Sequence, residues 1–176
     1  MTTNIFDLIS REDALRVLRN LCDADEAMRE RVLLEVNKVL NQIDPDAVAE
    51  DVLFDLDLLS VDDLWNRSGP RRDGYLSPDE MVVAMVEETL RPYVKRISQY
   101  HKAGMPEQAK QYCMGVLKGI YRYDQASESE LKKQAPDVPS ESFGWILMEW
   151  QKHGARRHRI QEMKEFLSRE CPKWAD

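Results

Sequence analysis

The sequence of 176 residues predicts an all-α fold, an irregular stack of antiparallel helix hairpins with about seven or eight helices. Two observations predict this class. Apolar residues recur at spacings of three and four along nearly the whole chain, and most of these segments follow a residue that caps helix N-termini. No segment of roughly four to eight residues alternates between β-branched and polar residues between turn signals, so we expect no β-sheet.

Four helices are expected before residue 68. Ser10 can cap the first, and Asp23 or Asp25 can cap the second, in which apolar residues at helical spacing form the clearest stripe of the chain. Asp44 can cap the third helix. The proline that follows Asp44 is compatible with this helix start, because proline loses no hydrogen bond at the first helical position. Ser60 can cap a short fourth helix.

We expect Trp65 to fill the core at this short fourth helix, which ends before Ser68, Gly69 and Pro70. A long helix then begins at Ser77, where a serine cap, a first-turn proline and Glu80 form a capping box. It ends near Gly104. Because Pro92 inside this helix removes one backbone hydrogen bond, we expect a kink near Glu88 unless the helix is broken there.

Three more helical segments are expected in the C-terminal part. Pro106 begins a helix in which Gly115 and Gly119 form a G-x-x-x-G face, and such a face lets a neighbouring helix approach closely. A polar connection with one short helical turn follows. Two closing helices are expected over roughly residues 140–153 and 155–171, separated by a glycine.

Charge is distributed unevenly along the chain. Through Asn66 it has 16 acidic against 6 basic residues, a charge of −10, and from Arg67 onward 16 acidic against 19 basic, a charge of +3. We expect one domain over 1–176, with a possible subdivision into acidic hairpins at 1–68 and the remaining helices at 69–176. The overall charge of −7 predicts a poor nucleic-acid binder, because phosphate affinity needs a concentrated basic surface.

The sequence predicts no membrane span, secretory signal, metal site or cofactor. Its longest apolar runs are far shorter than the roughly 20 residues that a span needs, and its N-terminus lacks the pattern of a signal peptide, so we expect a cytoplasmic protein. The cysteines and histidines lack the spacings of a disulfide framework or a zinc site. They are Cys22, Cys113, Cys171, His101, His153 and His158.

The loop Gly69–Glu80 matches the second half of an EF-hand calcium loop. Its third position, however, is Arg71, which places a positive charge where a carboxylate ligand would lie. A turn followed by the capping box from Ser77 to Glu80 explains every matching residue. The sequence therefore favours a structural loop without calcium.

Two clusters of basic residues are candidate binding sites for an anion or a partner. Arg67, Arg71 and Arg72 lie near the start of the long helix, where they can bind a phosphate or carboxylate or pair with Asp62 and Asp63.

The second cluster lies at residues 152–159 and contains Lys152, Arg156, Arg157 and Arg159. Basic residues at a helix N-terminus oppose the helix dipole, so a negative group is expected nearby. A neighbouring acidic helix, an RNA or an acidic peptide would each provide one, and the sequence leaves these alternatives open.

Residues 63–92, DLWNRSGPRRDGYLSPDEMVVAMVEETLRP, resemble a pattern found in an uncharacterised group of bacterial and archaeal helical proteins, in which related segments occur near SWIM-type zinc fingers. A looser likeness covers residues 111–124. The resemblance implies an α-α superhelix of the HEAT, armadillo or TPR kind and no assigned activity. This chain contains no cysteine-histidine zinc finger.

The leading hypothesis is a non-enzymatic helical module that binds an unknown protein partner, because stacked amphipathic helices occur without a nucleophile beside a base or a phosphate-binding glycine loop. Amphipathic aromatic residues often anchor such interfaces. The candidates are Tyr121, Tyr123, Trp145 and Trp150. The alternative is an enzyme of unknown reaction, with a cleft between the arginine loop and the acidic second or third helix. Arg71 or Arg72 and Asp62 or Asp63 would line this cleft.

Overall fold

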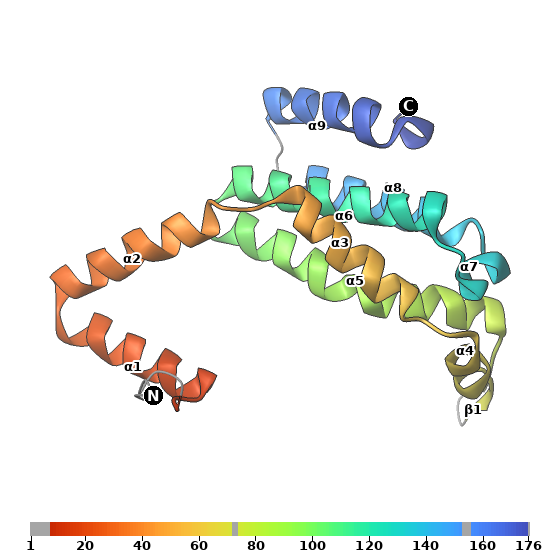
Figure 1. Ribbon diagram of the computed structural model, residues 1–176, viewed down its shortest axis with the longest axis horizontal. Coiled ribbons are helices and arrows are strands. Elements are labelled where there is room, and N and C mark those ends of the chain that lie inside the picture. Colours follow the sequence, from red (N-terminus) through yellow and green to blue (C-terminus); the bar gives the residue numbers. More distant parts are fainter. Residues whose placement is uncertain (1–7, 72–73, 153–155, 176) are drawn as a thin grey trace, which may run out of the picture. The chain divides into compact units, whose positions relative to one another are not determined.

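The computed structural model describes residues 8–71, 74–152 and 156–175 and is all-α except for one short β-hairpin (Figure 1). Contacts between residues divide the chain into two units, Met1–Gln42 and Ile43–Asp176. The helices on either side of residue 68 belong to the same unit.

The first unit contains a helix hairpin, α1 (Arg11–Ala24) followed by α2 (Glu26–Leu40). The side chain of Ser10 accepts a hydrogen bond from the backbone N–H of Asp13 at 3.1 Å. Of the two capping candidates for α2, the structure selects Asp25, whose carboxylate accepts hydrogen bonds from the first turn. Neither helix contains a buried residue.

The second unit holds the remaining elements, and three of its helices begin directly after the predicted capping residues Asp44, Ser60 and Ser77. They are α3 (Pro45–Asp57), α4 (Val61–Arg67), β1 (Gly69–Arg71), β2 (Gly74–Leu76), α5 (Pro78–Lys102), α6 (Pro106–Ala126), α7 (Glu130–Gln134), α8 (Val138–Lys152), α9 (Arg157–Glu170) and a 3₁₀ turn (Pro172–Trp174). The predicted all-α class is therefore confirmed.

Helix α6 is the centre of the second unit. It contacts α3 most extensively and also packs against α5, α8 and α9 (Figure 1). More of its residues are buried than in any other helix of the described chain. Because α3 packs on a helix far away in sequence, the contacts do not confirm a regular superhelical stack of neighbouring hairpins.

The close approach of α3 and α6 depends on two glycines. A Cβ atom at Gly115 would lie 2.6 Å from Cβ of Val48 and 2.7 Å from the carbonyl oxygen of Pro45. One at Gly119 would lie 2.7 Å from the carbonyl oxygen of Ala49. The G-x-x-x-G face therefore brings a neighbouring helix into direct backbone contact, as the sequence predicts.

Helix α5 runs unbroken through Pro92, so the helix break is excluded. It begins at the predicted capping box. The backbone N–H of Ser77 donates to the carboxylate of Glu80 at 2.9 Å, and the backbone N–H of Glu80 donates to the hydroxyl of Ser77 at 3.3 Å. Gly104 follows the helix with a φ of 70°, a conformation that glycine adopts at little cost.

The expectation of no β-structure is wrong at one place. Strands β1 and β2 pair antiparallel, with Gly69 opposite Leu76 and Arg71 opposite Gly74. Each strand has only three residues, too few for an alternating pattern to stand out in the sequence. The hairpin connects α4 to α5 and leaves the all-α class unchanged.

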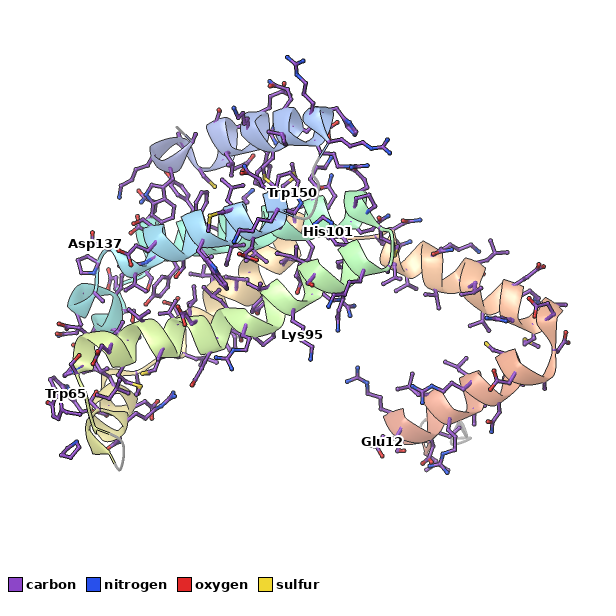
Figure 2. All side chains as sticks on the ribbon, turned by 180° about the vertical axis from the view of Figure 1, so that it is seen from behind. Glu12, Trp65, Lys95, His101, Asp137 and Trp150 are labelled. Atoms are coloured by element: carbon purple, nitrogen blue, oxygen red, sulfur yellow. The ribbon has the colours of Figure 1, made fainter. Side chains whose placement is uncertain are left out.

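The expectation that Trp65 fills the core is also wrong. Its side chain is 58% exposed, whereas that of Leu64 is 1% exposed. Adjacent residues on a helix point about 100° apart, so α4 can direct only one of the two toward the core. The apolar residue is buried and the indole lies outside (Figure 2).

Candidate functional site

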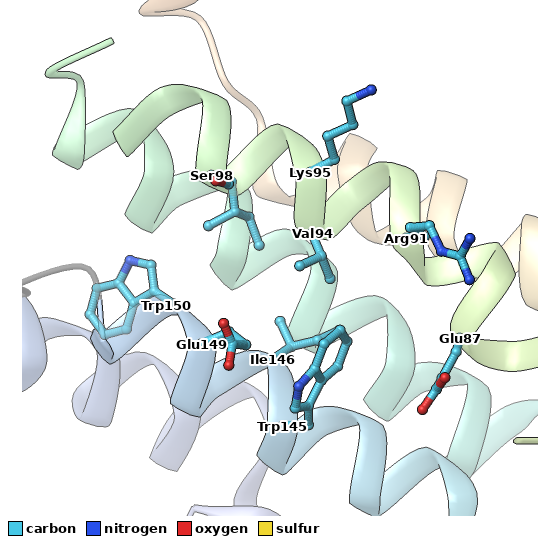
Figure 3. A pocket seen from close by; sticks show the side chains of 10 residues that line it. Glu87, Arg91, Val94, Lys95, Ser98, Trp145, Ile146, Glu149 and Trp150 are labelled. Carbon is cyan, nitrogen blue, oxygen red and sulfur yellow. The ribbon is translucent and has the colours of Figure 1, made fainter. Parts of the chain in front are cut away.

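A groove of about 620 Å³ lies between α5 and α8 in the second unit (Figure 3). The two helices run side by side and each contributes residues at helical spacing, so one face of each helix lines it. The lining residues are Glu87, Arg91, Val94, Lys95, Ile97, Ser98, Trp145, Ile146, Glu149 and Trp150. Two of the aromatic candidates from the sequence therefore meet in one groove.

The floor of the groove is apolar. Ile97 of α5 and both Ile146 and Trp150 of α8 line it and are buried, while Val94 is half-buried. In each helix these residues lie three or four positions apart and share one face. The floor is thus a continuation of the core that remains open on one side.

Trp145 is the exposed aromatic residue of this groove. Its side chain is 40% exposed, and Figure 3 shows it on the α8 side, across from Val94 on the α5 side. An indole carries a large apolar surface and one hydrogen-bond donor, which makes it a frequent anchor of protein interfaces. Covering Trp145 would remove this surface from water.

Charged side chains form the rim. Glu149 pairs with Lys152, whose amine lies 2.5 Å from its carboxylate. On the α5 side, Glu87, Arg91 and Lys95 form no ion pair among the described residues, so this side of the groove carries two basic groups and one acidic group. A ligand with apolar side chains and a carboxylate matches this arrangement.

The indole N–H of Trp150 is buried and has no hydrogen-bond acceptor within the described chain. It lies at the same end of the groove as Ser98 (Figure 3). A buried donor without an acceptor costs about 1–3 kcal/mol.

The arginine loop is only partly described. Arg67 pairs with Glu88 of α5 at 2.6 Å, and both side chains are exposed. Its described partner is therefore an acid of the second half of the chain, and not Asp62 or Asp63. The side chain of Arg71 and the whole of Arg72 lie outside the described residues, as does the turn expected at Asp73.

The acids proposed for an enzymatic cleft lie on the surface of α4. Asp62 and Asp63 are exposed, and the hydroxyl of Ser60 donates to the carboxylate of Asp63 at 2.8 Å. A hollow of about 300 Å³ beside Asp62 is lined by no arginine or lysine of the described chain. The described part of the chain therefore brings these acids to no basic group.

The basic cluster at 152–159 is partly neutralised within the chain. Lys152 pairs with a glutamate on the groove rim, and Arg159 lies 3.5 Å from the carboxylate of Glu107 in α6. Arg156 and Arg157 are exposed. For Lys152 and Arg159 the structure supports the expectation that acids of the same chain supply the negative charge.

An ion-pair layer between α6 and α9 was missed by sequence reasoning. Lys110 of α6 is buried and pairs with Glu107 and with Glu162 of α9. Burial alone would lower the pKa of Lys110, but the hydrogen bonds to both glutamates outweigh it and raise the pKa. The amine thus stays protonated, which suits a structural role and not a nucleophile.

A second group of ion pairs, formed by Lys118 and Arg122 of α6, belongs to the same layer. Lys118 lies 2.9 Å from Asp46 at the start of α3 and 2.5 Å from Glu170 at the end of α9. Arg122 reaches Asp46 at 2.7 Å. The hydrogen bond from Lys118 lowers the pKa of Asp46 and of Glu170. The only signal for this layer in the sequence is that Lys110 and Lys118 lie among the apolar residues of α6.

The other two aromatic candidates serve the core. Tyr123 is buried, and the half-buried ring of Tyr121 meets the ring of Trp174 edge-on at 5.2 Å. Of the four candidates, only Trp145 is exposed, while Trp150 forms part of the groove floor.

Within residues 8–71, 74–152 and 156–175, no three histidine, cysteine or acidic side chains lie together so that they could hold a metal ion. None of the helices described there combines the length and the apolar composition that crossing a membrane requires. In comparisons with known proteins, no family model, curated protein or solved structure matches the chain.

Proposed function

We propose that this protein is a non-catalytic helical module that binds a protein partner in the groove between α5 and α8. The observation that carries the proposal is the half-exposed Trp145 beside a buried apolar floor, in a groove of about 620 Å³. Exposed aromatic residues beside apolar hollows are typical anchors of binding energy.

The preferred ligand is an amphipathic helical segment with at least one acidic residue. A groove between two roughly aligned helices accepts a third helix along its length, with apolar side chains directed to the floor. Arg91 and Lys95 at the rim would pair with its acid.

We place this function in the cytoplasm and do not propose a nucleic-acid partner. Cys113 and Cys171 are buried free thiols, and burial raises the pKa of Cys171 to about 12. Unpaired thiols are typical of proteins in reducing compartments. The net charge of −7 disfavours binding to phosphate backbones. We also propose that the chain is related to the uncharacterised bacterial and archaeal helical proteins that residues 63–92 resemble.

Affinity capture from cells of the source organism tests the proposal, with the full chain and two variants as baits. Trp145→Ala removes the groove anchor. Trp65→Ala removes an indole that is also exposed, at 58%, but lies on α4. We expect the wild type and Trp65→Ala to capture the same partner, and Trp145→Ala to bind it at least about tenfold more weakly.

The outcome that contradicts the proposal is equal capture of every specific partner by all three baits. Circular dichroism and thermal unfolding provide the folding control for each bait. Because both tryptophans are exposed, we expect both alanine variants to keep the helical signal and a transition close to that of the wild type.

A further inference from the structure

The α1–α2 hairpin exposes an unusual number of large apolar side chains. Of the sixteen exposed large hydrophobic residues in the described chain, nine lie on the hairpin or just before it, with exposures of 42–74%. They are Leu8, Leu15, Val17, Leu18, Leu21, Leu33, Leu34, Val36 and Val39. Figure 2 shows the side chains that stand on both helices.

Several of these side chains surround a hollow within the hairpin itself. The hollow measures about 770 Å³ and is lined by one residue of α1 and nine of α2. Seven of the ten are apolar: Leu18, Met28, Val32, Leu34, Val36, Val39 and Leu40. The apolar stripe predicted for α2 therefore faces a space that neither helix fills.

The hairpin needs a cover to be stable. Neither α1 nor α2 has a buried residue, and helices of this length are marginal in water without an apolar partner. Two amphipathic helices that share an open apolar face are half of a four-helix bundle. A second hairpin of the same size would complete the bundle.

We infer that the α1–α2 hairpin pairs with the hairpin of a second copy of this chain. Charge supports an identical partner. Over residues 8–42 there are seven acidic and six basic side chains, a net charge of −1, so two copies repel each other only weakly through these surfaces. A twofold axis brings the same face of both copies together, which is the commonest symmetry of soluble homo-oligomers.

The available area also matches a dimer. A fully exposed leucine or valine side chain offers on the order of 100 Å² of apolar surface. Nine such side chains at 42–74% exposure therefore offer on the order of 450 Å². A stable homodimer interface buries about 800 Å² on each partner, of which about 500 Å² is apolar. Adjacent residues such as Leu33 and Leu34 point about 100° apart, so this sum is the upper limit of the apolar contact that the hairpin can give to a dimer.

Sedimentation of the full chain tests this inference over concentrations from about 0.1 to 100 µM. We expect the wild type to pass from monomer to dimer within this range. Leu34→Glu places a charge in the apolar face, and Leu58→Glu makes the same change at the residue that directly follows α3. The two leucines have nearly equal exposure, 61% and 62%.

We expect Leu34→Glu to raise the dissociation constant of the dimer by about 100-fold or more, because each copy would bury an unpaired charge. Leu58→Glu should leave the constant within about threefold of the wild type. A wild type that stays monomeric at every concentration overturns the inference, whether or not the variants fold. Equal weakening by both substitutions also overturns it.

Partner capture separates this inference from the proposed groove. Leu34→Glu should keep the partner that Trp145→Ala loses, and Trp145→Ala should still form the dimer. If a monomeric wild type nevertheless shows slow amide exchange in α1 and α2, another surface covers the hairpin, and the second copy is excluded.

Discussion

The contact of Gly115 and Gly119 with α3 is the most demanding feature at the scale of single residues. A methyl group at Gly115 would overlap the side chain of Val48 and the backbone of Pro45, and backbone atoms cannot move aside without shifting α3. At an exposed helix position, by contrast, alanine stabilises the helix more than glycine does. Packing and helix propensity therefore act in opposite directions at this site.

We predict that Gly115→Ala lowers the free energy of unfolding by about 1–3 kcal/mol, because overpacking exceeds the gain in helix propensity. Gly144→Ala in α8 is the matched control, because nothing lies within 4 Å of the added methyl group. It should raise the free energy of unfolding by about 0.5–1 kcal/mol. Chemical denaturation measures both, and a stabilised Gly115→Ala would refute the close α3–α6 contact.

A second prediction concerns the loop before α5. Ser77→Ala should lower the free energy of unfolding by about 0.5–2 kcal/mol, since it removes the hydroxyl that accepts from Glu80. Calcium at millimolar concentration should leave the melting temperature of the wild type unchanged, because a ligand that binds only the folded state must raise it. A rise with calcium that Glu80→Gln abolishes would identify a metal site instead.

Several residue-scale features could be predicted from the sequence because they depend on near neighbours. Ser10, Asp44, Ser60 and Ser77 each cap the helix that follows them, and the glycine face of α6 brings α3 close. The sequence could not decide which of two adjacent apolar residues enters the core, so Trp65 was misplaced. Burial depends on the orientation of the whole helix.

At the scale of elements, α9 is held on α6 by buried apolar side chains and by the ion pairs of Lys110 and Lys118. The pKa values of Asp46 and Glu170 lie below their ordinary range because Lys118 donates to both carboxylates. For Glu107, burial alone would raise the pKa, but the hydrogen bond from Lys110 outweighs it and lowers the pKa.

We therefore predict an acid-sensitive attachment of α9. A carboxylate with a lowered folded-state pKa stabilises the protein above its unfolded pKa, about 3.9–4.3, and this contribution is lost as the pH falls through the folded value. The free energy of unfolding should thus decrease as the pH falls from about 5 to about 3. Urea denaturation at a series of pH values measures the slope.

Lys118→Met is the informative variant for this pH dependence. It leaves Asp46 and Glu170 without their shared donor, so the protein should be less stable near neutral pH and its acid slope should be shallower. Lys152→Met, which removes the exposed partner of the half-buried Glu149, should change neither quantity appreciably. An unchanged slope in Lys118→Met would exclude the ion-pair layer as its cause.

The elements themselves were largely predictable, whereas their arrangement was not. Capping residues and apolar periodicity located the helices, and only the three-residue strands escaped notice. The groove depends on α5 and α8 lying side by side although dozens of residues separate them in sequence. Nothing local distinguishes the exposed Trp145 from the buried Trp150, so the sequence named both but could not place them in one site.

At the scale of the whole molecule, two surfaces in two different units carry the proposed interactions. The groove belongs to Ile43–Asp176 and the apolar hairpin to Met1–Gln42. Because substitutions in one unit need not alter the other, binding of a partner and pairing of two copies can be measured separately in the full chain. The proposed role is therefore that of a dimeric helical adaptor with one partner groove in each copy.

Site-specific photocross-linking tests the partner groove most directly. A photoreactive amino acid replaces Lys95, an exposed residue of the groove, or Gln161, an exposed residue of α9 outside it, and each full-length variant is irradiated with the captured partner. The account predicts a covalent product from position 95, its loss when Trp145→Ala is added, and little product from position 161. Efficient cross-linking from position 161 with none from position 95 would contradict it.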